Sequence, residues 1–528
     1  MAANHLDFDP NQLSQEGLNL LNQGEFKRSL EIFNKLNTHF PNNPDLLNLI
    51  AFANLQLEVF DEALSAYNSS ININPHQVGA LFNRAIVNEK LGKKKEALKD
   101  YEAALKFDPN NLDIYQNKAA IYEDLGQYDE ALENINHVIK NSPNNYEALA
   151  NRGNINQNKF DYINSKKDYL KALEINPNNE NLLINLGNVQ KQLQDYQGAE
   201  ETFKQALQLN NNSRDAHFNF SLLLLYLKRF KEGWSEYELR KTKNNIPEAI
   251  KNKTEITHIN STDKIIIWPE QGVGDQILFS SMLNDLPKKN SITVALDKRL
   301  LKIYRRSFDF LEFISLDELT NQKIKDFEYH IPLGSLGKFY RSNINQFKKQ
   351  KVSFLNPDKN KVKEIKNFFS KNNIKICGIS WKSKNEKIGH AKSLNLIDMR
   401  ELFLKNELCF LDLQYGDTQK EKDELFQKYN VLIESYPGID KFDDLDGLLA
   451  LIEVCDFVVT SSNVTAHLAG SIGKKTYLLI PHGLGKLWYW HDDNKSIWYP
   501  NIEIIEQKSN ENWIDSVNEI CKLLTFKK

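Results

Sequence analysis

The segment Glu270–Asp275, with the sequence EQGVGD, combines the residue types of a reactive turn. It follows the apolar run KIIIW and precedes a helical pattern over Gln276–Leu286, so it joins a buried strand to a helix. Gly272 and Gly274 permit a tight turn in which backbone amides at the helix start face an anion or a polar substrate. Asp275 would lie beyond the strand end, where its carboxylate can act as a general base. A plain tight turn, and an aspartate that only caps the helix, are the structural alternatives.

A second chemical motif follows the predicted strand DFVVTS, where the chain continues as SNVTAHLAGSIGKK. Ser462, Asn463 and Thr465 then lie at the start of a helix, with hydroxyl and amide groups beside the positive end of the helix dipole. This arrangement favours a diphosphate. His467 lies one turn into the helix and can donate to a phosphate, although an isolated histidine is more often structural.

Two further motifs have both a chemical and a structural interpretation. The segment DDLDG, at 443–447, contains the Asp-x-Asp pattern that binds a metal in some enzymes, but it precedes a helix and is expected to cap it. We therefore predict no metal site. Trp488, Trp490 and Trp498 either stack on a sugar or base, or pack the terminal segment.

The half of the chain that carries these motifs alternates short β-branched runs with amphipathic helical patterns, which predicts α/β structure. A polar linker is expected at 248–263, a first lobe at 264–354 and a second at 355–528. The predicted strands are 264–268, 291–296, 310–315, 375–381, 409–416, 430–435, 456–461 and 476–481. Helices are predicted over 361–372 and 513–524. Two Rossmann-like lobes with a cleft between them are the expected architecture.

The N-terminal half has an internal repeat of 34 residues. Prolines recur on this period at Pro41, Pro75, Pro109, Pro143 and Pro177. Two series of small residues, which begin at Gly17 and Ser29, allow the two helices of each repeat to cross closely. Aromatic residues, among them Tyr67 and Tyr101, fill the space between neighbouring pairs. The pattern predicts an all-α solenoid of about seven repeats over 10–247.

One polar series keeps the same period in the middle of the first helices: Asn83, Asn117, Asn151, Asn185 and Asn219. Asparagine is unfavourable inside a helix because its amide competes for backbone hydrogen bonds. A column of amides in the groove of a solenoid would suit an extended peptide, since each amide both donates and accepts. The alternative is compositional, because this region is rich in asparagine.

The repeat positions resemble those of tetratricopeptide (TPR) repeats, and the asparagine series is similar to the asparagine ladder of eukaryotic protein O-GlcNAc transferases. The motifs of the second half resemble bacterial TPR-linked glycosyltransferases, which are similar to heptosyltransferases of the GT-B fold. This second resemblance rests on EQGVGD, GISWKSKNEKIGHAKSL, FLDLQYGD, SNVTAHLAGSIGK and the later WYW and WYP segments.

The resemblance implies roles for individual residues. Asp275 matches the general base, and Lys382 and Lys392 lie in the loop that places a cation near the donor phosphates. The donor-binding turn is matched by Ser462, Asn463, Thr465 and His467. At Ser462 heptosyltransferases commonly have an aspartate that contacts the sugar, so this departure leaves the donor sugar unidentified.

The expected function is therefore an inverting, metal-independent glycosyl transfer from a nucleotide-diphosphate sugar to an acceptor hydroxyl. The acceptor is either a protein bound by the TPR groove, which the groove favours, or a cell-surface glycan. The first lobe would serve the acceptor and the second the nucleotide sugar, with no cofactor. The alternative is a non-catalytic scaffold with a degenerate sugar-nucleotide domain.

Composition is consistent with these expectations and excludes other classes. The 528 residues carry a net charge of −3, which implies no nucleic-acid partner. Four cysteines without metal-ligand spacing are ordinary for a reducing compartment. With a polar N-terminus and no apolar stretch of membrane-spanning length, a cytoplasmic protein is expected.

Overall fold

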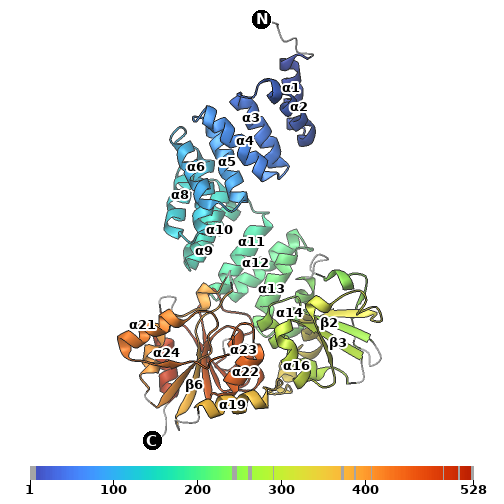
Figure 1. The fold of residues 1–528 in the computed structure, drawn as a ribbon, viewed down its shortest axis with the longest axis vertical. Helices are drawn as coiled ribbons and strands as arrows, with labels where there is room; N and C mark the ends of the chain where they lie inside the picture. The colour runs from blue at the N-terminus through green and yellow to red at the C-terminus, as the bar shows by residue number, and fades with distance from the viewer. Residues whose placement is uncertain are drawn as a thin grey trace. The chain divides into compact units, whose positions relative to one another are not determined.

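The computed structural model describes residues 8–240, 246–257, 259, 264–288, 291–369, 374–385, 388–405, 407–491, 493–508 and 512–524. These residues form two compact units, Met1–Asn178 and Asn179–Lys528 (Figure 1). The first unit is entirely helical. The second contains further helices of the same kind and an α/β region.

Antiparallel helix pairs build the first unit, two helices to each 34-residue period. Its helices are α1 (Pro10–Asn22), α2 (Phe26–His39), α3 (Pro44–Gln56), α4 (Phe60–Ile73), α5 (Val78–Lys90), α6 (Lys94–Leu105), α7 (Leu112–Asp124), α8 (Tyr128–Asn141), α9 (Tyr146–Asn158) and α10 (Tyr162–Ile175). The periodic prolines follow the second helix of each pair, as the sequence predicts. Asparagine caps several first helices: Asn111 accepts from the amide of Ile114, and Asn145 from that of Ala148.

The small residues of the first helices are required for close packing. A Cβ on Gly153 would lie 2.7 Å from the ring of Tyr169, the aromatic residue of the second helix in the same repeat. The sequence predicts that the aromatic residues fill the space between neighbouring repeats, and the structure agrees only in part. The rings lie against their own repeat, and the hydroxyl of Tyr101 reaches the next repeat, where it accepts from Asn117 at 3.0 Å.

The second unit begins with four helices that continue the 34-residue pattern: α11 (Glu180–Gln192), α12 (Tyr196–Leu209), α13 (Arg214–Tyr226) and α14 (Phe230–Tyr237). The short helix η1 (Glu238–Arg240) follows α14 directly. The predicted end of the solenoid near residue 247, and the linker over 248–263, fall partly outside the described residues. Described residues of that linker contain η3 (Glu248–Ile250) and the short strand β1 (Thr254–Glu255).

Trp234 of α14 joins these helices to the first sheet region. Its side chain is 1% exposed, and its indole nitrogen donates to the carbonyl oxygen of Arg341 at 2.8 Å. Its ring lies edge-on to Phe279 and Trp488, with centroid separations of 6.4 and 5.7 Å. A Cβ on Gly337 would meet this ring at 2.4 Å, so only glycine fits there. The last repeat is therefore part of the core of the α/β region.

Two parallel sheets follow. The first has the order β1-β5-β2-β3-β4, with β2 (Lys264–Trp268), β3 (Ser291–Leu296), β4 (Glu312–Ser315) and β5 (Tyr329–Pro332). The register pairs Ile266 of β2 with Thr293 of β3 and His330 of β5. Around this sheet lie α15 (Val273–Ser280), η4 (Leu283–Asp285), η5 (Lys298–Leu300), α16 (Leu301–Ser307), η6 (Leu316–Glu318), η7 (Leu333–Ser335), α17 (Leu336–Tyr340) and α18 (Ile344–Lys348).

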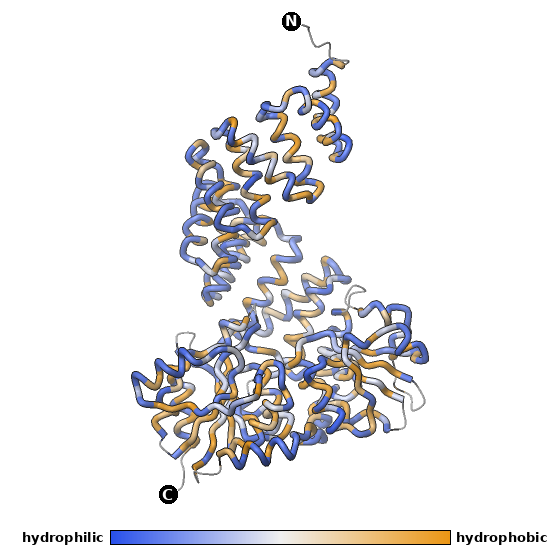
Figure 2. The backbone as a smooth tube through the Cα atoms, viewed as in Figure 1, coloured by the Kyte–Doolittle hydropathy of each residue, from blue (hydrophilic) through white to orange (hydrophobic). Residues whose placement is uncertain are grey.

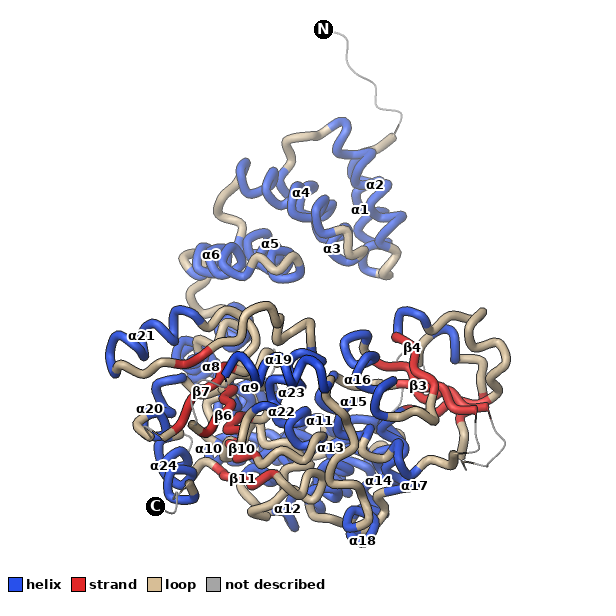
Figure 3. The backbone as a smooth tube through the Cα atoms, turned by 60° about the horizontal axis from the view of Figure 1, so that its bottom comes forward, coloured by secondary structure: helices blue, strands red, loops and turns tan. Residues whose placement is uncertain are grey.

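The second sheet has the order β11-β10-β9-β6-β7-β8. Its strands are β6 (Lys375–Ser380), β7 (Leu408–Asp412), β8 (Ile433–Glu434), β9 (Phe457–Ser461), β10 (Thr476–Ile480) and β11 (Ile502–Glu506). Its helices are α19 (Lys359–Phe369), η8 (His390–Lys392), η9 (Leu396–Met399), α20 (Arg400–Phe403), α21 (Gln419–Tyr429), α22 (Leu445–Val454), α23 (Val464–Ser471) and α24 (Ile514–Leu523). Figure 3 shows the two sheets as separate groups of strands. The strands are largely hydrophobic (Figure 2), because both faces of a parallel sheet are covered.

All eight predicted strands are present, and three strands were not predicted. β1 has only two residues, β5 has the mixed sequence YHIP, and β11 has the sequence IEIIE at the edge of its sheet. Two helices also begin earlier than predicted, α15 and, by two residues, α19 (Lys359–Phe369). α15 begins at Val273, so Asp275 lies in the first turn of the helix rather than before it.

Candidate functional site

A cavity of about 300 Å³ lies at the carboxyl ends of the central strands of both sheets. In the first sheet β2 lies between β3 and β5, and in the second β6 lies between β7 and β9, so the strand order reverses at each of these points. Ligands of open parallel sheets bind where the order reverses. The cavity brings together seven of the residues predicted to form the site: Gly272, Gly274, Asp275, Lys392, Ser462, Asn463 and His467.

Asp275 faces this cavity from the first turn of α15. It does not cap the helix, since the capping position is Gly272. Burial raises the pKa of the Asp275 carboxyl to about 6, against the opposing effect of Lys392, and the nearby charge of Glu270 raises it further. A carboxylate with a pKa near neutrality in a cavity is suited to general base catalysis.

Lys392 reaches the cavity from the second sheet, at the end of η8. Its side chain is 5% exposed, and a Cβ on Gly485 would lie 3.2 Å from its stem. Burial lowers the pKa of the Lys392 ammonium, and the charge of Asp275 acts in the opposite direction. Within the described ranges the Lys392 ammonium has no hydrogen bond or ion pair, so it is available to an anionic ligand.

His467 of α23 supports the EQGVGD turn. Its Nδ1 lies 3.1 Å from the hydroxyl of Tyr499, and its Nε2 lies 3.4 Å from that of Tyr489. Burial, with the charge of Lys392, lowers the pKa of the imidazole to about 3, so the ring is neutral at physiological pH. A Cβ on Gly274 would lie 3.1 Å from its Cδ2. His467 therefore packs beneath the turn, and both of its nitrogens have partners within the protein.

Asn463, Ser462 and Thr465 form the start of α23, as predicted. The Asn463 side chain accepts from the amide of Thr465 at 2.9 Å and donates to Ser380 Oγ at 2.8 Å, so it caps α23 and ties it to β6. Ser462 accepts from the indole nitrogen of Trp490 at 2.9 Å. Thr465 is fully buried and does not line the cavity. Of these three, Ser462 and Asn463 contribute to the cavity wall.

Lys382 is not brought to the cavity. Its ammonium pairs with Glu421 of α21, in a surface groove on another side of the second sheet. Its backbone carbonyl accepts from the side chain of Asn463 at 3.1 Å. Lys382 and Lys392 were predicted from one loop as alternative cations for donor phosphates, and only Lys392 faces the cavity.

Several cavity residues were not predicted: Arg299, Lys384, Tyr415, Lys441 and Phe442. Lys384 lies two residues after Lys382, and its ammonium is 4.9 Å from the ring centroid of Phe442. Arg299 lies at 4.9 Å from the centroid of the same ring. These residues come from loops and the short helix η5, whose sequences have no periodicity, so only the fold reveals that they meet.

The tryptophans pack the terminal segment. Trp490 and Trp498 are 0% and 1% exposed, and neither lines the cavity. Trp488 is half-buried against Trp234. This arrangement favours the structural interpretation over stacking on a sugar.

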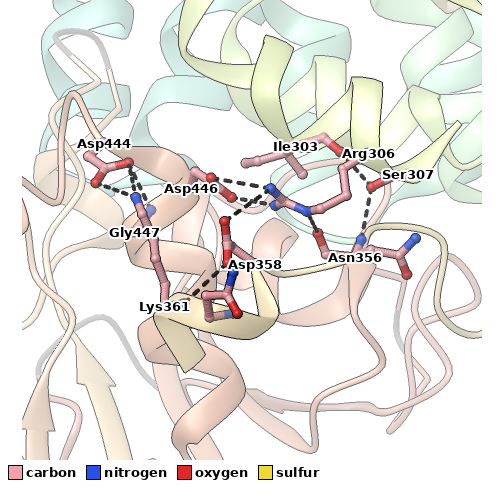
Figure 4. Close-up of polar contacts among 10 residues, drawn as sticks. Ile303, Arg306, Ser307, Asn356, Asp358, Lys361, Asp444, Asp446 and Gly447 are labelled. Carbon is pink, nitrogen blue, oxygen red and sulfur yellow. Dashed lines mark hydrogen bonds and ion pairs between the residues drawn. The ribbon is translucent and has the colours of Figure 1, made fainter. Parts of the chain in front are cut away.

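The Asp-x-Asp segment has a structural role as well (Figure 4). Asp444 accepts from the amide of Gly447 at 2.8 Å, so it caps α22 as predicted, and it pairs with Lys361 at 3.0 Å. Asp446 pairs with Arg306 of α16, whose Nε donates to the carbonyl oxygen of Asn356 at 2.8 Å. Asp446 thus links the two sheet regions, whereas the pair of Asp444 and Lys361 lies within the second. Across the described ranges, no group of three or more His, Cys, Asp or Glu side chains is arranged to hold a metal ion.

The periodic asparagines are half-buried, and their partners differ. In the first unit, the side-chain amide of Asn117 donates to the hydroxyl of Tyr101 at 3.0 Å. In the second unit, Asn219 donates to the carbonyl oxygen of Asp215 at 2.8 Å. At least one member of the series, Asn117, therefore has a structural role, because it satisfies a buried tyrosine hydroxyl.

Family models described as Tetratricopeptide repeat match residues 78–111, 100–133, 146–179 and 168–201. The chain therefore contains TPR repeats, as its sequence predicts, and TPR repeats indicate a protein-interaction role. No helix within the described residues is long and apolar enough to cross a membrane.

Among curated proteins, the chain is similar to Protein FlbA of Caulobacter vibrioides, with 25% identity over 324 residues. The match covers 57% of this chain and 53% of FlbA, so it spans about half the length of that relative. Solved structures that it matches include a tetratricopeptide repeat protein from Parabacteroides merdae, with 15% identity, a TM-score of 0.39 and coverage of 43% of this chain and 91% of that one. MamA from Desulfovibrio magneticus RS-1 matches with 19% identity, a TM-score of 0.31 and coverage of 33% and 98%.

Proposed function

We propose that this protein transfers a sugar from a nucleotide-diphosphate sugar to an acceptor hydroxyl, with its two sheet regions acting as the Rossmann-like lobes of a GT-B glycosyltransferase. The observation that supports the proposal most is the pairing of two groups in one cavity. The Asp275 carboxylate has a pKa raised to about 6, and the Lys392 ammonium has no other hydrogen-bond partner among the described residues. They face the cavity from different sheet regions, at the points where each strand order reverses.

Asp275 would act as the general base. Its carboxylate accepts the proton of the acceptor hydroxyl while the oxygen attacks the anomeric carbon from the side opposite the diphosphate. The new bond joins the acceptor oxygen to the anomeric carbon, and the bond to the diphosphate breaks. A single displacement of this kind inverts the anomeric configuration and requires no covalent intermediate.

Positive charge for the departing diphosphate would come from the second sheet region. Lys392 lies in the cavity wall, Lys384 is close by in the same loop, and backbone amides at the start of α23 add a favourable helix dipole. These groups can balance the negative charge that develops on the leaving oxygen, so the proposed step requires no metal ion.

The TPR repeats would present the acceptor, which we propose is a protein. In the first unit the half-buried amides of Asn83, Asn117 and Asn151 lie one per repeat on α5, α7 and α9. Amides at a regular spacing suit the backbone of an extended peptide. Replacing Asn117, Asn151 and Asn185 together with alanine should weaken acceptor use and leave donor binding unchanged.

A thermal-shift screen of UDP-, GDP- and ADP-sugars tests the donor half of the proposal, since a ligand stabilises the state that binds it. We expect one nucleotide class to raise the melting temperature, and Lys392→Met to abolish the shift. Lys382→Met is the matched control, because Lys382 lies in the same loop but outside the cavity. The absence of a shift with every donor would favour a non-catalytic scaffold. One observation favours the scaffold: the side chains of Asn463, His467 and Lys382 already have partners within the protein.

A further inference from the structure

The last turn of the helical repeats contacts the turn that carries Asp275. Both segments belong to the second compact unit. The side-chain amide of Gln271 donates to the hydroxyl of Tyr237, at the end of α14. Arg240, three residues further along in η1, forms an ion pair with Glu270, the first residue of EQGVGD. Two consecutive residues of the turn are thus bound by the end of the solenoid.

Arg240 and Glu270 form a closely enclosed pair. Their side chains are 7% and 12% exposed. The Arg240 guanidinium lies 3.9 Å from the ring centroid of Tyr237 and donates to the carbonyl oxygen of that residue at 2.7 Å. A further contact, at 3.3 Å, joins it to Ser335 Oγ. A Cβ on Gly334 would lie 2.6 Å from Glu270 Oε1, so the backbone leaves space for the carboxylate only because this residue is glycine.

This enclosure fixes where the negative charge of Glu270 lies relative to Asp275. Removal of one member of a buried ion pair leaves the other charge uncompensated. Without Arg240, the Glu270 carboxylate would be uncompensated beside Asp275, where its charge disfavours ionisation of Asp275, and the turn would lose one of its contacts to the solenoid end. The pair therefore controls both the position and the electrostatic surroundings of Asp275.

We propose that Arg240 is a positioning residue: through Glu270 it fixes the turn that directs Asp275 into the cavity, so that the last repeat of the solenoid forms part of the catalytic site. The proposal rests on the proposed function of Asp275 as the general base. It assigns to the TPR region a role beyond the binding of an acceptor.

The test must account for the other titratable and charged groups near Asp275. Among the described residues, those that face it or line its cavity are Glu270 on its own turn, Lys392 from η8, His467 from α23, Tyr237 and Arg240 from the solenoid end, Tyr489 and Tyr499 from the C-terminal segment, and Arg299, Lys384, Tyr415 and Lys441 from the cavity wall. The variants below change only Arg240 and Glu270, so the remaining groups are common to every measurement.

The experiment measures carbodiimide labelling of Asp275 against pH in the full chain, with tandem mass spectrometry to locate the label. Arg240→Met should raise the labelling midpoint by about one pH unit, because the unpaired Glu270 carboxylate disfavours a second charge. Glu270→Gln should lower the midpoint. The double variant should match Glu270→Gln, since a neutral side chain at position 270 no longer requires Arg240.

Arg229→Met is the control, since Arg229 pairs with Glu200 and Glu232 on the helical repeats and should leave the midpoint unchanged. An unchanged midpoint in Arg240→Met, or a double variant that behaves like Arg240→Met, overturns the proposal. If Arg240→Met does not fold, the Glu270→Gln variant decides the outcome. An Asp275 labelling midpoint that does not fall in that variant overturns the proposal. Labelling of Asp275 does not depend on sugar turnover, so this experiment can fail while the assignment of Asp275 as general base holds. That assignment is tested separately, by donor turnover in Asp275→Asn.

Discussion

Replacing Asp275 with asparagine should make the protein more stable at neutral pH. The folded state raises the pKa of this carboxyl from an ordinary value of 3.8 to about 6. The folded state therefore binds more protons than the unfolded state between these values, and stability falls as pH rises through this window. A shift of about two units corresponds to roughly 3 kcal/mol. Because the carboxylate faces a cavity open to water, we expect about 2 kcal/mol of this cost at pH 7.5.

Thermal unfolding of the wild type and Asp275→Asn at pH 7.5 and pH 4 measures this cost. The variant should melt several degrees higher at pH 7.5, and the difference should shrink to a small part of that at pH 4, where the folded-state carboxyl is protonated and the unfolded-state carboxyl, with its ordinary pKa of 3.8, is only about half ionised. Asp297→Asn is a control of opposite sign, because Arg299 holds the pKa of the Asp297 carboxyl below its ordinary value. That variant should lose stability at pH 7.5. Equal or lower stability of Asp275→Asn at pH 7.5 would refute the raised pKa and the reasoning built on it.

Three further predictions follow from the same contacts. The acid limb of kcat/KM for the active donor should have an apparent pKa near 6, because only ionised Asp275 can accept a proton; a limb near pH 4 would contradict this. Gly274→Ala should lower kcat by at least about tenfold, since its Cβ would meet His467 at 3.1 Å and shift the turn, whereas Gly272→Ala should keep wild-type stability because its nearest atom lies at 3.9 Å. The fragment 179–528 should unfold cooperatively when its melting is followed by circular dichroism. The fragment 248–528 should not, because that fragment lacks Trp234, which fills the core beside the first sheet.

Much of the fold follows from sequence periodicity. The 34-residue period places the helix pairs, because the small residues, the caps and the prolines each have a local physical cause. The eight predicted strands are apolar enough to be buried on both faces. β5 was missed because its neighbours in the sheet, rather than its own composition, make it a strand, whereas β11 was missed although it is rich in isoleucine. The burial of Trp234 among distant residues such as Arg341 also depends on tertiary packing that no local pattern encodes.

The candidate site could be predicted only where a motif lies at a strand end. Asp275 and Ser462 each follow the last residues of a central strand, so their positions follow from the pattern of a parallel sheet. Lys392 and Lys382 could not be separated from the sequence, since both lie in one irregular loop. The fold buries Lys392 beside the cavity and pairs Lys382 with Glu421. The contact between Arg240 and the EQGVGD turn is equally invisible, because it joins two segments through side chains alone.

The most direct test of sugar transfer is the release of nucleoside diphosphate from a panel of UDP-, GDP- and ADP-sugars by the full chain and by Asp275→Asn. The account predicts that one donor class is turned over, and that the isosteric variant loses at least about 100-fold in kcat, a loss expected for removal of a general base, while it still binds that donor. Equal turnover by the variant, or no turnover of any donor by the wild-type chain with a candidate protein acceptor present, would contradict it.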